Sequence, residues 1–288
     1  MIKPESTSNA PEQMSSAHFI GIGGSGMSGI ATMFSQLGIK VSGSDVRDSH
    51  AIQGLREQGI DARVGHDAAN LGLVDAVVVT GALWQDNPEY VAAQERGITI
   101  MHRSRALKWL TKGKRLVSVA GAHGKTTSTG MIVSALLELG AKPGFVNGGV
   151  VQALRTSSSL GESDLFVIEA DESDGSFLIY DTKVALITNV DADHLDHYGT
   201  HEAFDNAFVD FADAADELVV ISSDDDGARR VREKLRHAHV VTFGLDNSAD
   251  VRVSHIESSA DGVSFVIHHD GVSLPSHLGV SGAHNAIN

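Results

Sequence analysis

Apolar, strand-like runs alternate with helix-like segments along most of the chain. Such alternation is typical of parallel sheets with helical crossovers, so we predict an α/β fold. The strands predicted in the first half are 18–21, 40–42, 76–80 and 98–101, with helices at 27–37 and 87–94. The strands predicted in the second half are 115–120, 165–170, 184–190 and 217–222, with a helix at 131–139.

The pattern changes between residues 250 and 277, where apolar and polar residues alternate with a period of two. Asp-Gly pairs at 261–262 and 270–271 separate the runs, and Asp-Gly between alternating strands is a strong hairpin signal. We therefore predict a small antiparallel extension of the second sheet. The chain then stops inside what looks like the start of a helix, so we expect a further C-terminal portion.

The chain is predicted to have three regions. The polar residues 1–16 contain two prolines and several serines, which favours a disordered tail. Residues 17–112 are predicted to form a Rossmann-like parallel-sheet domain, with a basic, mostly helical stretch before the junction. Residues 113–288 are predicted to form a second α/β domain, incomplete at its C-terminus.

The composition of the chain excludes several classes of binding partner and site. The sequence has 22 Lys and Arg against 37 Asp and Glu, a net charge of −15 that would repel nucleic acid and anionic membranes. It has no cysteine, which excludes disulfides and thiolate metal sites. No apolar run reaches the ~20 residues of a membrane span, and the first residues lack the apolar core of a signal peptide. We expect a cytoplasmic protein that binds neither nucleic acid nor membrane.

The segment 117–127 reads Val-Ser-Val-Ala-Gly-Ala-His-Gly-Lys-Thr-Thr, a β-branched run, a glycine turn and the mouth of a helix. Backbone N–H groups at such a turn bind anions, and the helix dipole adds positive charge. Lys125 can reach the terminal phosphates of a nucleotide, and Thr126 can ligate Mg²⁺. The first glycine of a Walker loop is replaced by Val119, so this is a shortened loop that starts at Gly121.

A second glycine loop, Gly21-Ile-Gly23-Gly24-Ser-Gly26, follows the first predicted strand and opens a helix. Asp45 lies at the end of the next strand, near the spacing of an acid that binds ribose. The pattern suits NAD, FAD or the diphosphate and ribose of a nucleotide sugar. A nicotinamide enzyme seldom needs a second phosphate loop, so the pair of loops disfavours an oxidoreductase.

Acidic residues follow two neighbouring predicted strands, in the runs 169–174 and 191–197. Because the carboxyl ends of parallel strands share one edge of a sheet, both runs are expected beside the phosphate loop. Mg²⁺ prefers one or two carboxylates, water and substrate phosphates. Glu169 and His194 are the predicted metal ligands together with Thr126, and the remaining acids are expected to support them or to cap helices.

Four stretches, 21–31, 121–127, 169–177 and 188–196, together resemble the Mur ligases. Smaller agreements are Gly43-Ser-Asp45, Asn87-Pro-Glu89, Asn147-Gly-Gly149 and the terminal His284-Asn285-x-x-Asn288. The resemblance covers residues 18–288 and is strongest to the branch that adds L-alanine.

The resemblance implies roles for individual residues. The UDP-sugar is expected at Gly23, Gly24, Ser25, Gly26, Met27, Ser44 and Asp45. ATP is expected at Gly121, Ala122, His123, Gly124, Lys125, Thr126, Thr127, His284, Asn285 and Asn288. Lys125, Glu169 and His194 are the expected catalytic residues.

It also implies a reaction. ATP, with Mg²⁺, transfers its γ-phosphoryl group to the lactyl carboxylate of UDP-N-acetylmuramic acid, and L-alanine attacks the acyl phosphate to form an amide in peptidoglycan precursor synthesis. The chemistry needs charge neutralisation more than covalent catalysis by side chains.

Two departures from the family pattern stand out. Some members bridge their metals with a carbamylated lysine, but no lysine lies between Lys183 and Lys234, so an acid such as Asp210 would have to substitute. The family's third domain, on the order of 150 residues, is absent from this sequence. Residues 1–288 alone are therefore expected to bind the UDP-sugar but to ligate poorly or not at all.

Other functions fit parts of the sequence. A murein tripeptide recycling ligase is a close relative within the class, but its first glycine loop is expected to lack the Gly-Gly-x-Gly-Met pattern seen at 23–27. A folate polyglutamylating ligase would share the central domain but not a UDP-binding first domain. A nucleotide-sugar-binding module without catalysis would need only the first loop, and an NAD-dependent oxidoreductase would also use Gly21–Gly26 with Asp45.

Overall fold

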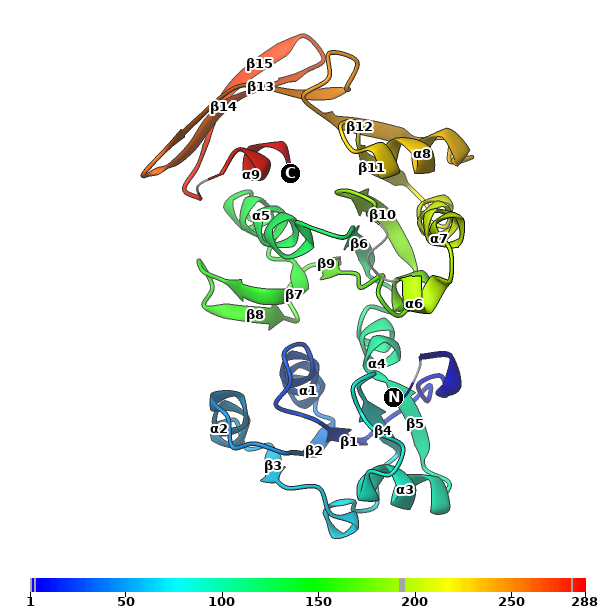
Figure 1. The fold of residues 1–288 in the computed structure, drawn as a ribbon. Coiled ribbons are helices and arrows are strands. Elements are labelled where there is room, and N and C mark those ends of the chain that lie inside the picture. Colours follow the sequence, from blue (N-terminus) through cyan, green and yellow to red (C-terminus); the bar gives the residue numbers. More distant parts are fainter. Residues whose placement is uncertain (1, 3, 192–194, 281) are drawn as a thin grey trace. The chain divides into compact units, whose positions relative to one another are not determined.

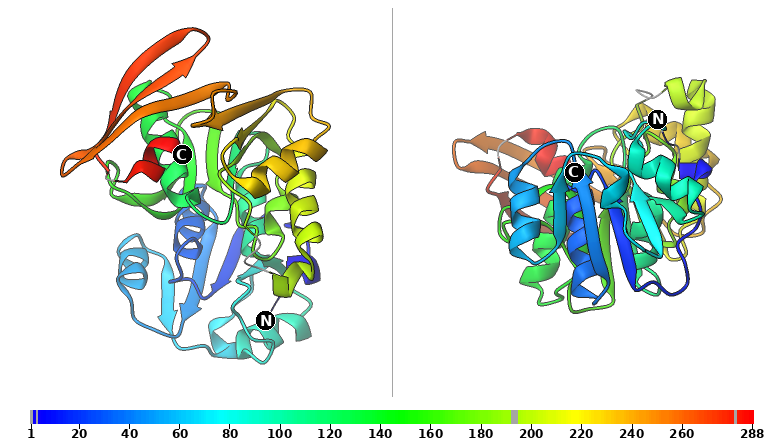
Figure 2. Two further views of the ribbon diagram at one scale, coloured as in Figure 1. Left: turned by 45° about the horizontal axis from the view of Figure 1, so that its top comes forward. Right: turned by 90° about the horizontal axis from the view of Figure 1, so that it is seen from below.

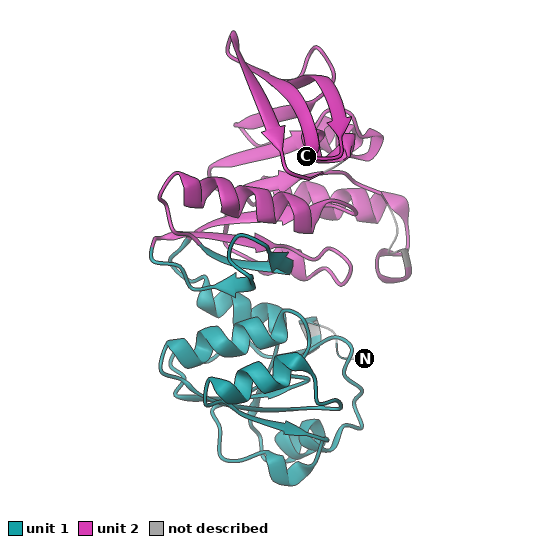
Figure 3. Cartoon of the chain, turned by 90° about the vertical axis from the view of Figure 1, so that its left-hand side faces the viewer, with its two compact units in different colours: residues 1–114, 144–162 teal, residues 115–143, 163–288 magenta. Residues whose placement is uncertain are grey.

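The computed structural model describes residues 2, 4–191, 195–280 and 282–288, which form two compact units. Unit 1 comprises residues 1–114 and 144–162, and unit 2 comprises residues 115–143 and 163–288 (Figure 3). The sequence placed the junction two residues earlier and assigned the segment 144–162 to the second domain. Within the described ranges, every helix is too short or too polar to cross a membrane.

Unit 1 is built on a parallel sheet with the strand order β3-β2-β1-β4-β5 (Figure 1). Its strands are β1 Ser16–Ile20, β2 Lys40–Asp45, β3 Asp61–Val64, β4 Ala76–Val79 and β5 Thr99–His102. The chain reverses its direction of winding after β3, so the carboxyl ends of β1 and β4 flank the point where ligands bind in open α/β sheets.

Helices cover both faces of this sheet. Successive residues of β1 point to opposite faces, so neighbouring residues pack in different clusters. Phe19 packs edge-on against Phe34 of the first helix, which contacts Trp109 of the fourth. Ile20 lies in a second cluster with Val77 and Tyr90. The elements outside the sheet are η1 Pro4–Ser6, α1 Met27–Gln36, α2 His50–Glu57, η2 Ala68–Asn70, α3 Pro88–Glu95 and α4 Arg103–Leu110.

The N-terminal segment differs from the expected disordered tail. Ile2 is buried in the cluster with Val77 and Tyr90, and the N–H of Ser8 donates to the carbonyl of Ile100 at 2.8 Å. Trp109 donates from its indole N–H to a backbone carbonyl of the same segment. One apolar side chain and several backbone hydrogen bonds therefore fix a stretch whose composition is polar.

Unit 2 contains a second sheet with the strand order β15-β14-β13-β12-β11-β10-β6-β9, and β7 and β8 of unit 1 pair with each other in antiparallel fashion. Strands β6 and β9 to β12 pair in parallel, and β13 to β15 form an antiparallel meander. The bounds are β6 Arg115–Ala120, β7 Gly144–Val151, β8 Thr156–Ser159, β9 Leu165–Glu169, β10 Thr182–Ile187, β11 Leu218–Ser222, β12 Val240–Gly244, β13 Val251–Ser259, β14 Gly262–His269 and β15 Val272–Leu278. The predicted meander is confirmed. Its second turn is the predicted pair Asp270-Gly271, and its first turn is Ala260-Asp261, one residue before the predicted pair, because Gly262 already pairs in β14.

The helices of unit 2 follow the strands. They are α5 Lys125–Glu138, η3 Ser176–Ile179, α6 Leu195–Tyr198, α7 His201–Asp213, α8 Asp226–Lys234 and α9 Ala283–Ile287. α5 begins at Lys125, before the predicted start at 131, because Gly124 provides its N-cap. α9 packs against the meander, as the red helix in Figure 2 shows. There Ala286 joins Val253 and Phe265 in a small apolar cluster.

Candidate functional site

The phosphate loop joins β6 to α5 and has the backbone of an anion site. Gly124 has a φ of 84° at the N-cap of α5, and no side chain caps that helix. The first N–H groups of a helix have no intrahelical acceptor, so they suit a phosphate. A Cβ on Gly121 would lie 2.2 Å from the Thr188 hydroxyl, and this close approach explains a second glycine.

Residues after β10 hold the loop from one side. The His123 N–H donates to the Asn189 side-chain carbonyl at 2.9 Å, and the Asn189 amide donates back to the His123 carbonyl at 2.7 Å. The Thr188 hydroxyl donates to the same carbonyl at 2.7 Å. These contacts preorganise the loop, and sequence reasoning missed the role of both side chains.

Lys125 lies between the loop and a buried acid. Its ammonium group donates to the Gly121 carbonyl at 2.6 Å and to Glu172 Oε1 at 2.9 Å. The Glu172 side chain is 1% exposed, so burial raises its pKa, and the charge of Lys125 opposes that rise. A lysine that is 15% exposed and held at the loop is positioned to meet a phosphate.

Thr126 and Glu169 supply a pair of hard oxygen ligands. The exposed Thr126 donates from its hydroxyl to the two Glu169 carboxylate oxygens at 3.0 and 2.9 Å, at the end of β9. A hydroxyl beside a carboxylate at a phosphate loop fits Mg²⁺, which completes its shell with water and substrate phosphates. Among the described residues, no group of three or more His, Asp or Glu forms a metal site. His194, the third predicted ligand, lies outside the described residues.

The other acids of these runs have different positions. Asp171 accepts hydrogen bonds from the N–H and hydroxyl of Ser173, and Asp174 accepts one from the N–H of Ser176. They shape the turn into η3, whose N-cap is Gly175 without a side-chain cap, so neither acid is the N-cap of this helix. Asp210, the expected substitute for a carbamylated lysine, is exposed near the end of α7.

Asn288 of the terminal motif lies against the phosphate loop. A Cβ on Gly124 would lie 2.5 Å from the side-chain nitrogen of Asn288, so this amide sits against the phosphate loop. Asn285 is partly buried and His284 is exposed in α9. The Asn288 amide thus adjoins the mouth of α5.

The glycine loop of unit 1 is held by the end of β2. The Ser44 carbonyl accepts the N–H groups of Gly21 and Ile22, at 2.8 and 3.0 Å. The Gly23 N–H donates to Asp45 Oδ2 at 2.9 Å, so the expected ribose ligand also acts as a brace for the loop. Gly26 caps α1 with a φ of 73° and no side-chain cap, as Gly124 does in unit 2.

The predicted UDP-sugar residues divide by exposure. Gly24 and Ser25 are exposed at the tip of the loop. Met27 is 3% exposed and Ser44 is fully buried, so their side chains belong to the interior of unit 1. They can support a ligand only through the backbone or through neighbouring residues.

A buried polar network, which sequence reasoning missed, lies beneath Ser44. Glu89 is fully buried near the start of α3, and its Oε2 accepts the Ser44 hydroxyl at 2.5 Å and contacts His18 Nε2 at 3.3 Å. Its Oε1 accepts the side chain of Asn70 at 2.7 Å. Burial alone would raise the pKa of Glu89, but hydrogen bonds from His18, Ser44 and Asn70 outweigh it and lower that pKa to about 2.

We expect Glu89 to make the stability of unit 1 depend on acid. Its pKa falls from the ordinary 4.5 to about 2, so the stabilisation is complete above pH 4.5 and is lost as the pH falls through 2. It amounts to on the order of 3 kcal/mol. In urea unfolding followed by the two tryptophans, both in unit 1, Glu89→Gln should be less stable than the wild type at pH 7.

That difference should shrink toward zero between pH 4.5 and 2. Asp205→Asn, which changes another buried carboxylate in unit 2, is the control and should leave the tryptophan transition unchanged. A Glu89→Gln deficit that is the same at pH 7 and pH 2.5 would contradict the assignment.

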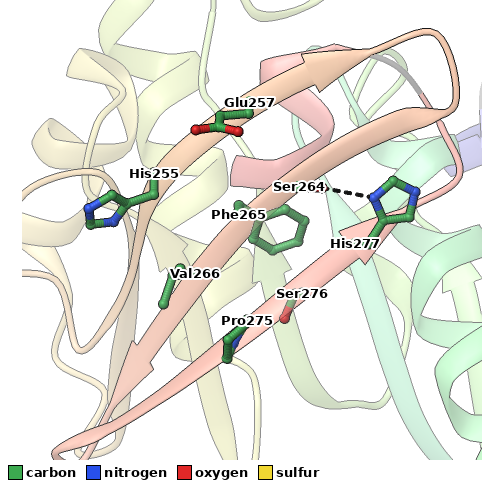
Figure 4. Close-up of a pocket in the computed structure, with 8 residues that line it drawn as sticks. All are labelled: His255, Glu257, Ser264, Phe265, Val266, Pro275, Ser276 and His277. Carbon is green, nitrogen blue, oxygen red and sulfur yellow. Dashed lines mark hydrogen bonds between the residues drawn. The ribbon is translucent and has the colours of Figure 1, made fainter.

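The meander carries an open surface pocket of about 420 Å³ away from the predicted site residues. His255, Glu257 and His277 contribute its polar lining around Phe265 (Figure 4). Ser264 and His277 are hydrogen-bonded at 3.0 Å, which occupies one nitrogen of that imidazole. Nothing in this lining matches the chemistry of the two glycine loops.

The comparisons with known proteins agree with this geometry. Residues 16–115 match the model of the Mur ligase family, catalytic domain, and residues 119–288 match the Mur ligase middle domain. The chain belongs to the Mur ligase family, which confirms the resemblance and the fold.

Curated relatives narrow the comparison. UDP-N-acetylmuramate–L-alanine ligase of Clavibacter michiganensis subsp. michiganensis is 65% identical over 288 residues, which are 100% of this chain and 60% of the relative. The enzyme of the same name from Thermobifida fusca is 45% identical over 96% of this chain and 59% of its own length. The chain thus spans about 60% of the length of these relatives.

Two solved structures have the same fold. UDP-N-acetylmuramate-alanine ligase of Thermotoga maritima matches with a TM-score of 0.85 and 28% identity, over 96% of this chain and 63% of that one. A UDP-N-acetylmuramate:L-alanyl-γ-D-glutamyl-meso-diaminopimelate ligase from Neisseria meningitides also reaches 0.85, with 27% identity and coverage of 96% and 90%.

Proposed function

We propose that this chain carries the UDP-sugar and ATP sites of an ATP-dependent ligase that joins L-alanine to UDP-N-acetylmuramic acid. The observation that carries the proposal is the loop 121–127, with Lys125 at its mouth and the Thr126–Glu169 oxygen pair beside it. The curated relatives at 65% and 45% identity support the choice of substrate.

The residues of unit 2 suit phosphoryl transfer. Loop N–H groups and Lys125 neutralise the β- and γ-phosphates, and the Asn288 amide lies beside them. Thr126, Glu169 and, from the resemblance, His194 would hold Mg²⁺, which neutralises phosphate charge when bound. The γ-phosphoryl group passes from ATP to the lactyl carboxylate and leaves ADP. The amine of L-alanine then displaces phosphate and forms the amide.

Parallel calorimetric titrations of this chain test the proposal. UDP-N-acetylmuramic acid and Mg·ATP should each bind. NADH should not bind, because the proposal assigns the first glycine loop to a nucleotide sugar. Preference for NADH would overturn the proposal in favour of an oxidoreductase. Residues 1–288 alone are still expected not to ligate, which formation of UDP-N-acetylmuramoyl-L-alanine would contradict.

A second candidate is a ligase that adds a peptide instead of L-alanine. The Neisseria structure, a ligase of that kind by its name, has the same TM-score as the Thermotoga structure. Ligation assays on the full-length protein with L-alanine and with L-alanyl-γ-D-glutamyl-meso-diaminopimelate decide between them. Turnover of the tripeptide alone would replace the first proposal.

A further inference from the structure

The buried network of unit 1 ends at an imidazole on the carboxyl edge of its sheet. His66 follows β3, where the Gly65 N–H donates to the Asp45 carbonyl at 2.8 Å. Its side chain is 16% exposed, and its Nδ1 lies 2.8 Å from the Ser44 hydroxyl. His66 thus stands beside the strand end that braces the glycine loop.

The direction of each hydrogen bond follows from Glu89. An ionised carboxylate only accepts, so its partners must all donate. Oε1 receives the side-chain amide of Asn70 and the N–H of Asp67, at 2.7 and 3.2 Å. Oε2 receives the Ser44 hydroxyl at 2.5 Å and His18 Nε2 at 3.3 Å.

The hydrogen bond from Ser44 to Glu89 determines the direction of the hydrogen bond between Ser44 and His66. A serine hydroxyl can donate one hydrogen bond, and the Ser44 hydroxyl donates it to Glu89. The Ser44 oxygen can therefore only accept from His66, so His66 Nδ1 must carry a hydrogen. His66 Nδ1 is 3.6 Å from Glu89 itself, too far for a direct hydrogen bond. In a neutral imidazole, Nε2 is then an acceptor.

We propose that Glu89 is a positioning residue that fixes His66 in the Nδ1–H tautomer, so that Nε2 accepts a hydrogen bond from a nucleoside N–H or O–H group of the UDP-sugar. The inference rests on the proposed function for its ligand, but the tautomer itself does not. A ribose hydroxyl and the uracil imide N–H are the two donors of this kind in a uridine diphosphate. A diphosphate oxygen cannot satisfy Nε2, because it has no proton to donate.

Glu89→Gln should reverse the direction of the hydrogen bond between Ser44 and His66. Two donors, Asn70 and the Asp67 N–H, face the Oε1 position, so the glutamine oxygen occupies that side and its NH₂ group faces Ser44. The Ser44 oxygen then accepts a hydrogen bond from the glutamine NH₂ group, and the Ser44 hydroxyl donates one to His66 Nδ1. His66 changes to the Nε2–H tautomer and offers a donor where the wild type offers an acceptor.

The tautomer is measured by ¹⁵N NMR of the imidazoles at pH 8, with His66 assigned through His66→Ala. We expect Nδ1–H in the wild type, Nε2–H in Glu89→Gln and no change in the control Asp205→Asn. A merely structural role of Glu89 would not reverse a tautomer. An Nε2–H signal in the wild type would overturn the inference whether or not any ligand binds.

The contact is measured with UDP, 2′-deoxy-UDP, 3′-deoxy-UDP and N3-methyl-UDP. One analogue should bind the wild type on the order of tenfold more weakly than UDP, but should bind His66→Ala as well as UDP does. That analogue identifies the donor as a hydroxyl or the imide. Equal losses in both proteins, or no loss in either, would overturn the contact. If UDP and UDP-N-acetylmuramic acid fail to bind although the tautomer is as expected, the proposed function fails and the ligand contact with it.

Discussion

Lys125→Met is expected to lower the affinity of the chain for Mg·ATP by roughly 100-fold or more, since it removes the charge-assisted hydrogen bonds to the terminal phosphates. The affinity for UDP-N-acetylmuramic acid should stay within about twofold, because the loop expected to bind it belongs to unit 1. Calorimetric titration of the same protein with each ligand measures both. Loss of both affinities together would mean that the two sites are not separable.

The variant has a second effect that needs a control. Methionine removes the cation that faces Glu172, whose side chain is 1% exposed, and breaking such a pair costs about 3–5 kcal/mol. Lys125→Met with Glu172→Gln should recover much of the stability without recovering ATP binding. Recovery of ATP affinity in the double variant would show that Lys125 acts only on the fold.

Glu169→Gln is expected to remove the dependence of ATP binding on a divalent metal. The glutamine can still accept from the Thr126 hydroxyl, but the charge that attracts a metal ion is lost. Calorimetry with ATP in Mn²⁺ and in EDTA should give wild-type affinities that differ at least about tenfold, as expected for a metal held by protein and phosphate together. In the variant the two affinities should converge.

Glu217→Gln provides the matched control for that experiment. Glu217 lies in the same unit, is partly exposed and pairs with Arg115 at 2.7 Å. It should keep the wild-type response to metal. If Glu169→Gln also keeps it, the metal is held elsewhere and the Thr126–Glu169 pair is structural.

The sequence predicted the α/β class and most strands because apolar strands and the Asp-Gly turns have local signatures. It did not reveal α2 and β3, since α2 buries only Ile52 and Leu55, and β3 only Ala62. Helix α7 was omitted although Phe204, Phe208 and Phe211 lie at helical spacing behind the cap Thr200. That signal was available in the sequence.

Some residues of the candidate site could be predicted from local motifs, and others could not. Lys125, Thr126 and Glu169 could be named because their motifs are contiguous and strand ends converge on one edge. The contact of Lys125 with Glu172 depends on the turn after β9, which no spacing rule gives. The Glu89 network joins segments far apart in the sequence, so no local pattern shows that these polar groups share one buried centre.

The brace between Asp45 and the Gly23 N–H has a consequence for selectivity. The carboxylate occupies a donor that a diphosphate would claim, so an arriving anion has to displace one negative charge with another. Inorganic phosphate is expected to gain little from this exchange, because Asp45 Oδ2 loses its hydrogen bond from the Gly23 N–H and free phosphate offers no ribose hydroxyl in return. A nucleotide can replace the anion and also offer ribose hydroxyls to the carboxylate. We therefore expect this loop to bind a nucleotide in preference to inorganic phosphate.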